Sequence, residues 1–140
     1  MSFHEKSSWI MFSLISITGL LYLAEVFSLT HNEKLPPPDA PSLVLYLAAM
    51  AVLSIIGHIV IAALAPKDAN ARLDEREVVI FARAGSIAGH VFSVGVVLSM
   101  FLYLLEPNGD ILFYCVAATL VISELADCAV KIYLYRIGVL

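Results

Sequence analysis

The chain has 140 residues, of which 61% are hydrophobic and 14% are charged, and its formal net charge is −4. Soluble domains usually carry about a quarter charged residues, so this composition excludes an ordinary soluble domain and favours an integral membrane protein embedded in a lipid bilayer. No basic patch stands out along the chain, so we expect no direct binding of nucleic acid.

Four apolar segments, each close to the length that crosses a bilayer, follow one another along the chain. We predict membrane spans at residues 9–29, 43–65, 78–105 and 111–136. Asp74 and Glu77 form a D-x-x-E capping box that predicts a helix start ahead of the third span, and Asp110 is expected to cap the fourth. We therefore expect one all-α domain over residues 1–140, a four-transmembrane-helix bundle.

The basic residues predict how this bundle lies in the membrane. They gather around the connector between the second and third spans and near the C-terminus, at Lys67, Arg72, Arg76, Arg83, Lys131 and Arg136. Because lysine and arginine are enriched on the cytoplasmic side of membrane proteins, we expect both termini and this connector to be cytoplasmic.

Two histidines and two carboxylates lie inside the last three spans: His58, His90, Glu124 and Asp127. Ionisable groups inside a bilayer are costly unless they have a partner, so each of the four is a candidate for a functional site. Counted from the cytoplasmic ends of the helices, their depths run from about 10 Å to about 18 Å. We expect a polar cluster in the inner half of the bundle, between the second, third and fourth helices.

Such a cluster is compatible with several kinds of chemistry. Its two histidines and two carboxylates could hold a divalent metal, and His58 with His90 could alternatively be the axial ligands of a haem b. A histidine beside a carboxylate could also handle protons in a small proton- or ion-coupled transporter that acts as an oligomer. In a purely structural alternative, Asp127 pairs with Lys131 at i,i+4 and polar neighbours satisfy the histidines.

Two further motifs lie in the third predicted helix. Gly85 and Gly89 form a G-x-x-x-G pattern, which is typical of close helix packing and also fits a homodimer face. A charged stretch precedes them, comprising Asp74, Glu75, Arg76, Glu77 and Arg83. Its acidic residues favour a helix N-terminus, and the alternative is a docking surface for a cytoplasmic regulator protein.

Three blocks of the sequence carry a family resemblance: FHEKSSWI, GHIVIAALAPKDANARLDEREVVIFARAGSIAGHV and SELADCAVKIYLYRIG. They resemble a family of small prokaryotic four-span membrane proteins of unknown function. The resemblance implies a multi-pass protein of the inner (plasma) membrane, with a site that rests on His58, Arg83 and Glu124. His90 and Asp127 depart from the family's pattern. Family members are often encoded beside a small helix-turn-helix regulator, which implies a regulatory or sensory role.

No nucleophile–base arrangement and no phosphate-binding loop is present in the sequence, so we expect no enzyme activity. The leading interpretation is a non-enzymatic regulatory or sensory membrane protein that forms a homo-oligomer, and we expect this oligomer to be a homodimer. A metal- or haem-binding membrane protein is the second interpretation, and the oligomeric transporter is the third.

Overall fold

The structure, a computed structural model, describes residues 3–30, 35–64 and 74–138. Within these residues it has no strand and four helices: α1 (Phe3–Leu29), α2 (Ala40–Leu64), α4 (Glu75–Leu105) and α5 (Gly109–Ile137). All four are long and apolar enough to cross a membrane. The all-α prediction is confirmed, and the four helices fit a multi-pass membrane protein.

Each helix begins before its predicted span, because polar first turns extend it beyond the apolar run. The largest difference is in α1, which starts at Phe3 rather than at residue 9. The capping box ahead of α4 is present, with the amide of Glu75 donating to Asp74 over 2.7 Å. The cap of α5 is Asn108, not Asp110, because the Asn108 side chain accepts the amide of Asp110 at 2.9 Å.

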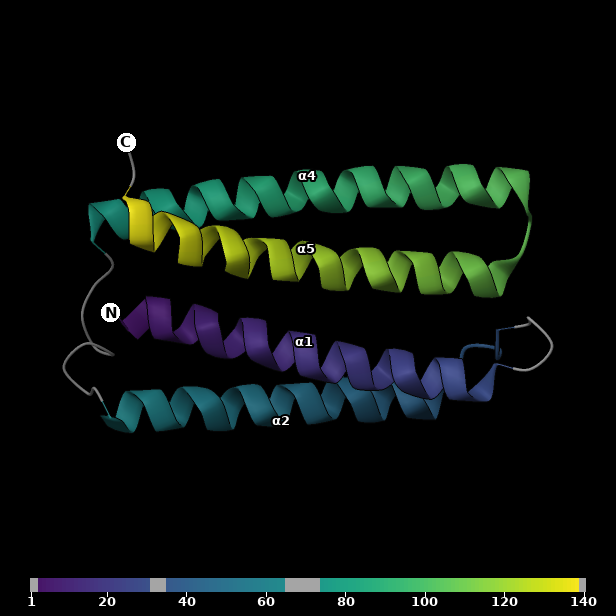
Figure 1. Ribbon diagram of the computed structural model, residues 1–140, viewed down its shortest axis with the longest axis horizontal. Helices are drawn as coiled ribbons and strands as arrows, with labels where there is room; N and C mark the ends of the chain where they lie inside the picture. Colours follow the sequence, from purple (N-terminus) through teal and green to yellow (C-terminus); the bar gives the residue numbers. More distant parts are fainter. Residues whose placement is uncertain (1–2, 31–34, 65–73, 139–140) are drawn as a thin grey trace.

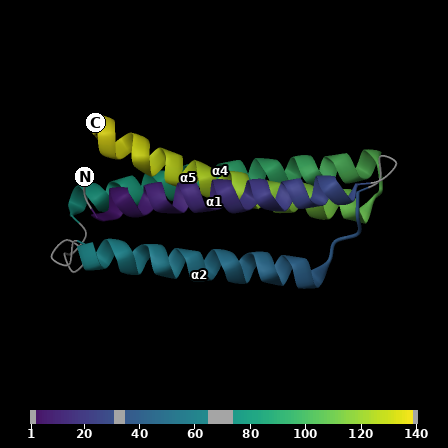
Figure 2. The ribbon, with the colours of Figure 1, turned by 60° about the horizontal axis from the view of Figure 1, so that its bottom comes forward.

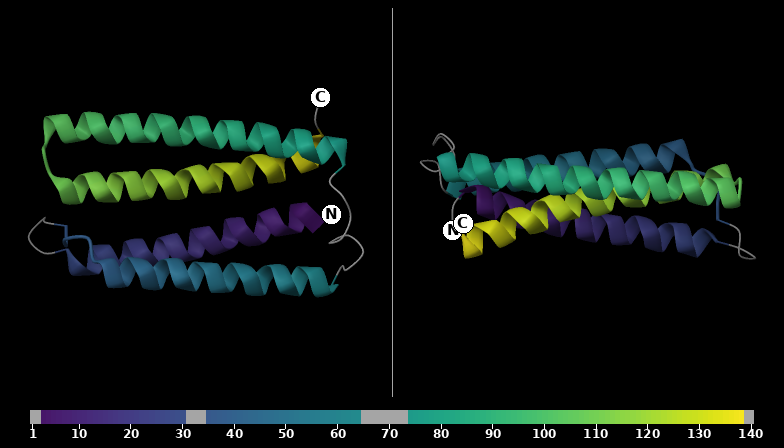
Figure 3. Two further views of the ribbon diagram at one scale, coloured as in Figure 1. Left: turned by 180° about the vertical axis from the view of Figure 1, so that it is seen from behind. Right: turned by 90° about the horizontal axis from the view of Figure 1, so that it is seen from above.

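Helix α5 lies in the middle of the arrangement. It packs against α4 on one side and α1 on the other, and α1 in turn packs against α2. Figure 1 shows this order, with neighbouring helices antiparallel and both chain ends at the same end of the molecule. Figure 2 shows α2 set apart from the other three helices, and Figure 3 shows that the helices do not lie in one plane. Helices α2 and α4 therefore stand at opposite ends of the packing order.

Glycines bring neighbouring helices close together at two crossings. A β-carbon at Gly95 in α4 would lie 2.7 Å from Oγ1 of Thr119 in α5. A β-carbon at Gly57 in α2 would lie 2.9 Å from a methyl carbon of Ile10 in α1. Small residues are used in this way in membranes, where close van der Waals contact replaces the hydrophobic drive for helix association.

Most large apolar side chains point away from the helix contacts. Leu104 is 78% exposed and Leu45 is 72% exposed, whereas the core is confined to a few residues such as Ile15, Ile80 and Ala84. In water such a surface would aggregate, but in a bilayer the lipid chains cover it. Polar groups on this surface need a different explanation, and they mark the candidate site.

Candidate functional site

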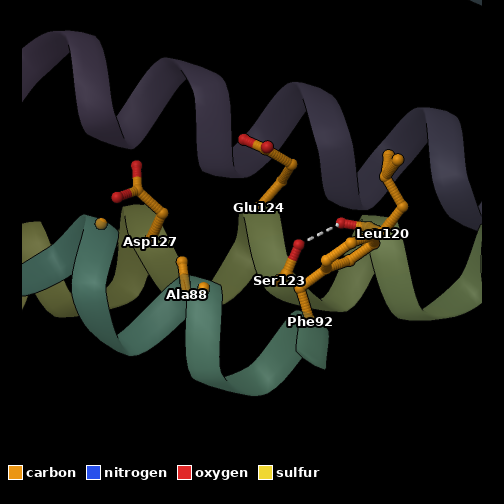
Figure 4. A pocket seen from close by; sticks show the side chains of 8 residues that line it. Ala88, Phe92, Leu120, Ser123, Glu124 and Asp127 are labelled. Carbon is orange, nitrogen blue, oxygen red and sulfur yellow. Dashed lines mark hydrogen bonds between the residues drawn. The ribbon is translucent and has the colours of Figure 1, made fainter. Parts of the chain in front are cut away.

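An open groove runs between α4 and α5, with a volume of about 430 Å³. Its lining comes from two helices: Gly85, Ala88, Gly89 and Phe92 of α4, and Leu120, Ser123, Glu124 and Asp127 of α5 (Figure 4). A β-carbon added at either glycine would meet nothing within 4 Å. The G-x-x-x-G pattern therefore shapes a wall of the groove and does not serve close packing between the described helices.

Two carboxylates line this groove and differ in their surroundings. Asp127 accepts a hydrogen bond from Lys131 one turn further along α5, the ion pair predicted from the i,i+4 spacing. The Lys131 ammonium also lies 4.6 Å from the ring centroid of Phe81 in α4. Glu124 is exposed and has no hydrogen bond or ion pair with any described residue. Its carboxylate projects from α5 on the same side as that of Asp127 (Figure 4).

Polar groups also occupy the exposed side of α4. Nδ1 of His90 lies 2.6 Å from the main-chain oxygen of Ser86. A carbonyl only accepts, so Nδ1 carries the proton and donates, which leaves Nε2 of neutral His90 as an acceptor. The Ser86 hydroxyl has no hydrogen bond with any described residue. Both residues are exposed, and neither lines the groove.

His58 belongs to a different helix contact, between α1 and α2. Its Nδ1 lies 2.8 Å from the main-chain oxygen of Ser54, and its Nε2 lies 2.8 Å from the Ser7 hydroxyl of α1. Nδ1 must again be the donor, so Nε2 of the neutral ring accepts from Ser7. Both ring nitrogens of His58 are thus occupied within the chain.

The structure does not bring the four residues predicted as metal ligands together. Glu124 and Asp127 line the groove, His90 lies outside it on α4, and His58 faces α1. Across the described part of the chain, no group of three or more His, Cys, Asp or Glu side chains could hold a metal ion. His58 and His90, the predicted haem ligands, likewise sit on helices at opposite ends of the packing order. Similar depth in a bilayer does not determine which helices are neighbours.

The charged stretch predicted as a docking surface contacts the end of α5. The Tyr135 hydroxyl donates to Glu77 over 3.2 Å, and the Arg76 guanidinium donates to the main-chain oxygen of Tyr135 over 3.3 Å. Asp74 caps the helix, Glu75 lies in its first turn, and Arg83 lies exposed further along. These contacts tie the start of α4 to the end of α5, and we call them the helix-end clamp. Sequence patterns gave no sign of Tyr135 as the shared partner.

A second link joins the end of α5 to the start of α1. The Arg136 guanidinium lies 3.9 Å from the carboxylate of Glu5 and 5.5 Å from the ring centroid of Trp9. Glu5 is buried although it stands in the first turn of α1. Its burial was not expected from the sequence, because an N-terminal glutamate reads as an exposed helix-start residue.

Comparison of the chain with protein-family models, curated proteins and solved structures finds no match. The candidate site therefore rests on the residues and geometry of this chain alone.

Proposed function

We propose that this chain is a non-enzymatic regulatory or sensory membrane protein whose binding site is the groove between α4 and α5. The observation that carries the proposal is Glu124, an exposed carboxylate in the middle of an apolar helix with no partner among the described residues. An ionisable group in the hydrocarbon layer is strongly unfavourable unless a polar group meets it. The groove then takes an occupant that donates hydrogen bonds or carries positive charge.

A regulatory role follows from the position of the helix-end clamp. The groove lies between α4 and α5, and the clamp connects the same two helices at a different height. An occupant that changes the spacing of these helices also strains or relaxes the contacts of Tyr135 with Glu77 and Arg76. Small helix shifts of this kind are a common means of passing a signal along a helical protein.

The proposal includes an orientation in the inner (plasma) membrane of a prokaryote. Arg76, Lys131 and Arg136 lie at the same end of the molecule as the N-terminus of α1, as the contacts of Arg76 and Arg136 require. By the positive-inside tendency this end is cytoplasmic. The helix-end clamp then faces the cytoplasm, where a regulator protein is accessible to it.

The test is photocrosslinking of the full chain in its own membrane. A photoreactive amino acid replaces Phe92 in the groove, and the adduct formed on irradiation is identified by mass spectrometry. We expect an adduct that decreases several-fold in Glu124→Leu. A photoreactive group at Ile87, which is exposed on α4 but lies outside the groove, is the matched control. An adduct at Phe92 that is indifferent to Glu124 would show that the carboxylate does not define the site.

A further inference from the structure

Two polar side chains of the α4–α5 hairpin, Ser86 and Glu124, have no hydrogen-bond partner among the described residues and lie within about one helical turn of each other in height. His90 lies beside them, with its Nδ1 hydrogen-bonded to the main-chain oxygen of Ser86. The contact between Gly95 and Thr119 sets the two antiparallel helices level at that point. His90 lies five residues before Gly95, and Glu124 lies five residues after Thr119. Because the two helices run in opposite directions, both steps lead toward the same end of the molecule, so His90 and Glu124 stand at the same height. Ser86 stands four residues from His90, which corresponds to about 6 Å along the helix.

The Ser86 hydroxyl and the Glu124 carboxylate are complementary as hydrogen-bond donor and acceptor, but they lie apart within one chain. The Ser86 hydroxyl is a donor without an acceptor, and the Glu124 carboxylate is an acceptor without a donor among the described residues. Ser86 lies on the exposed side of α4, and Glu124 lies in the groove on α5. Within the described part of one chain, both groups stay unsatisfied.

A second copy of the chain, related by two-fold symmetry, is the occupant that can supply both an acceptor for Ser86 and a donor for Glu124. Two copies inserted with the same orientation are related by an axis along the membrane normal, so each residue keeps its depth in both copies. A two-fold contact is reciprocal: if one residue of the first copy contacts another residue of the second copy, the same contact also forms with the two copies exchanged. A donor and an acceptor within one turn in depth on one chain can therefore meet across such an axis.

We infer that the groove receives helix α4 of a second copy, with Ser86 of each copy donating a hydrogen bond to Glu124 of the other. Gly85 and Gly89 present no side chain toward the groove and leave open space there, which lets the incoming helix approach closely. The site of Glu124 is incomplete in the single chain and is completed by the partner. This inference rests on the proposed function and names the occupant of the same groove.

Cysteine crosslinking in membranes tests the arrangement. The native Cys115 and Cys128 are first replaced by alanine in the full chain. Gly85→Cys is then compared with Ile87→Cys, which lies two residues away and therefore roughly 200° around the helix. We expect a crosslinked dimer with a short bis-maleimide for Gly85→Cys and none for Ile87→Cys. The reverse pattern, or no dimer with either cysteine, overturns the inference.

The hydrogen bond itself is tested by Ser86→Ala and Glu124→Leu in the Gly85→Cys background. Each substitution should reduce the crosslinked dimer by at least about threefold, the effect of a typical hydrogen bond between membrane helices. Glu124→Gln keeps an acceptor oxygen and should retain most of the dimer. A dimer insensitive to all three substitutions contradicts the Ser86–Glu124 pairing.

The two proposals fail in different ways. If the occupant is a lipid or another protein, the photoreactive group at Phe92 still gives an adduct that depends on Glu124, but that adduct does not contain a second copy. The inference about the second copy is then wrong and the proposed function stands. If no adduct at Phe92 depends on Glu124, the proposed function fails as well.

Discussion

Gly95 and Thr119 are in direct contact where α4 crosses α5. A β-carbon at position 95 would lie 2.7 Å from Oγ1 and 3.0 Å from Cβ of Thr119, with Cγ2 nearer still. The Thr119 hydroxyl donates to the main-chain oxygen of Cys115 over 2.9 Å, which holds its rotamer. Glycine at position 95 is therefore what lets the two helices meet at this height, and the height fixes which residues line the groove.

Replacing Gly95 by alanine should destabilise the α4–α5 contact. Rotation of the short, β-branched Thr119 side chain cannot relieve the clash, because its Cβ is also too close. Overpacking of this kind typically costs about 1–3 kcal/mol. The measurement is reversible unfolding in mixed detergent micelles.

The matched control for Gly95 is Gly109→Ala, since a β-carbon at Gly109 meets nothing within 4 Å. Adding Thr119→Ala to Gly95→Ala should restore part of the lost stability by removing the two nearest atoms. If Gly95→Ala unfolds at the same denaturant concentration as the wild type, the close crossing is not present in the membrane protein.

Loss of the Lys131 ammonium should destabilise the fold through Asp127. Lys131→Met preserves an unbranched side chain over Phe81 but leaves a half-buried carboxylate without its donor. Removing one partner of a charged hydrogen bond costs about 1–3 kcal/mol. The same unfolding experiment measures the loss.

A double-mutant cycle separates the ion pair from packing at these positions. Lys131→Met combined with Asp127→Leu should be more stable than Lys131→Met alone, because no unpaired charge then remains. Equal stability of the single and double variants would mean that Asp127 finds another partner or is solvated.

Removing the Tyr135 hydroxyl should loosen the helix-end clamp. Tyr135→Phe eliminates the donor to Glu77 while the aromatic ring and the main-chain oxygen that binds Arg76 are kept. One hydrogen bond contributes about 1 kcal/mol, so backbone hydrogen exchange in the first turn of α4 should become several-fold faster. Tyr133→Phe is the control, because Tyr133 is exposed and has no hydrogen bond to a described residue. Equal exchange in the two variants would exclude the clamp.

The fold was predictable from the sequence to the extent that it depends on local composition. Apolar runs of spanning length, the capping box at Asp74 and the i,i+4 spacing of Asp127 and Lys131 are properties of neighbouring residues, and the structure contains all of them. These features need no knowledge of which helix packs on which.

The candidate site was predictable only in part, because it depends on the packing order of the helices. The similar depths of His58 and His90 suggested a shared site, but α2 packs on α1 and α4 packs on α5. Helix order in a membrane depends on small residues and on the side chains that they meet across a contact, as Gly57 meets Ile10. A single sequence shows the glycine but not its partner.

His58 gives the most direct distinction between a structural role and metal binding. Its two ring nitrogens are engaged by Ser54 and Ser7, so His58→Ala should weaken the α1–α2 contact and leave the metal content of the purified protein unchanged. Ser7→Ala should reproduce part of the destabilisation, about 1 kcal/mol, because it leaves Nε2 without its donor. Elemental analysis and the absorption spectrum of wild type and His58→Ala provide the measurement. A metal or a haem Soret band that disappears with His58 would show that the ring acts as a ligand, and that α2 must then lie elsewhere in the assembled protein.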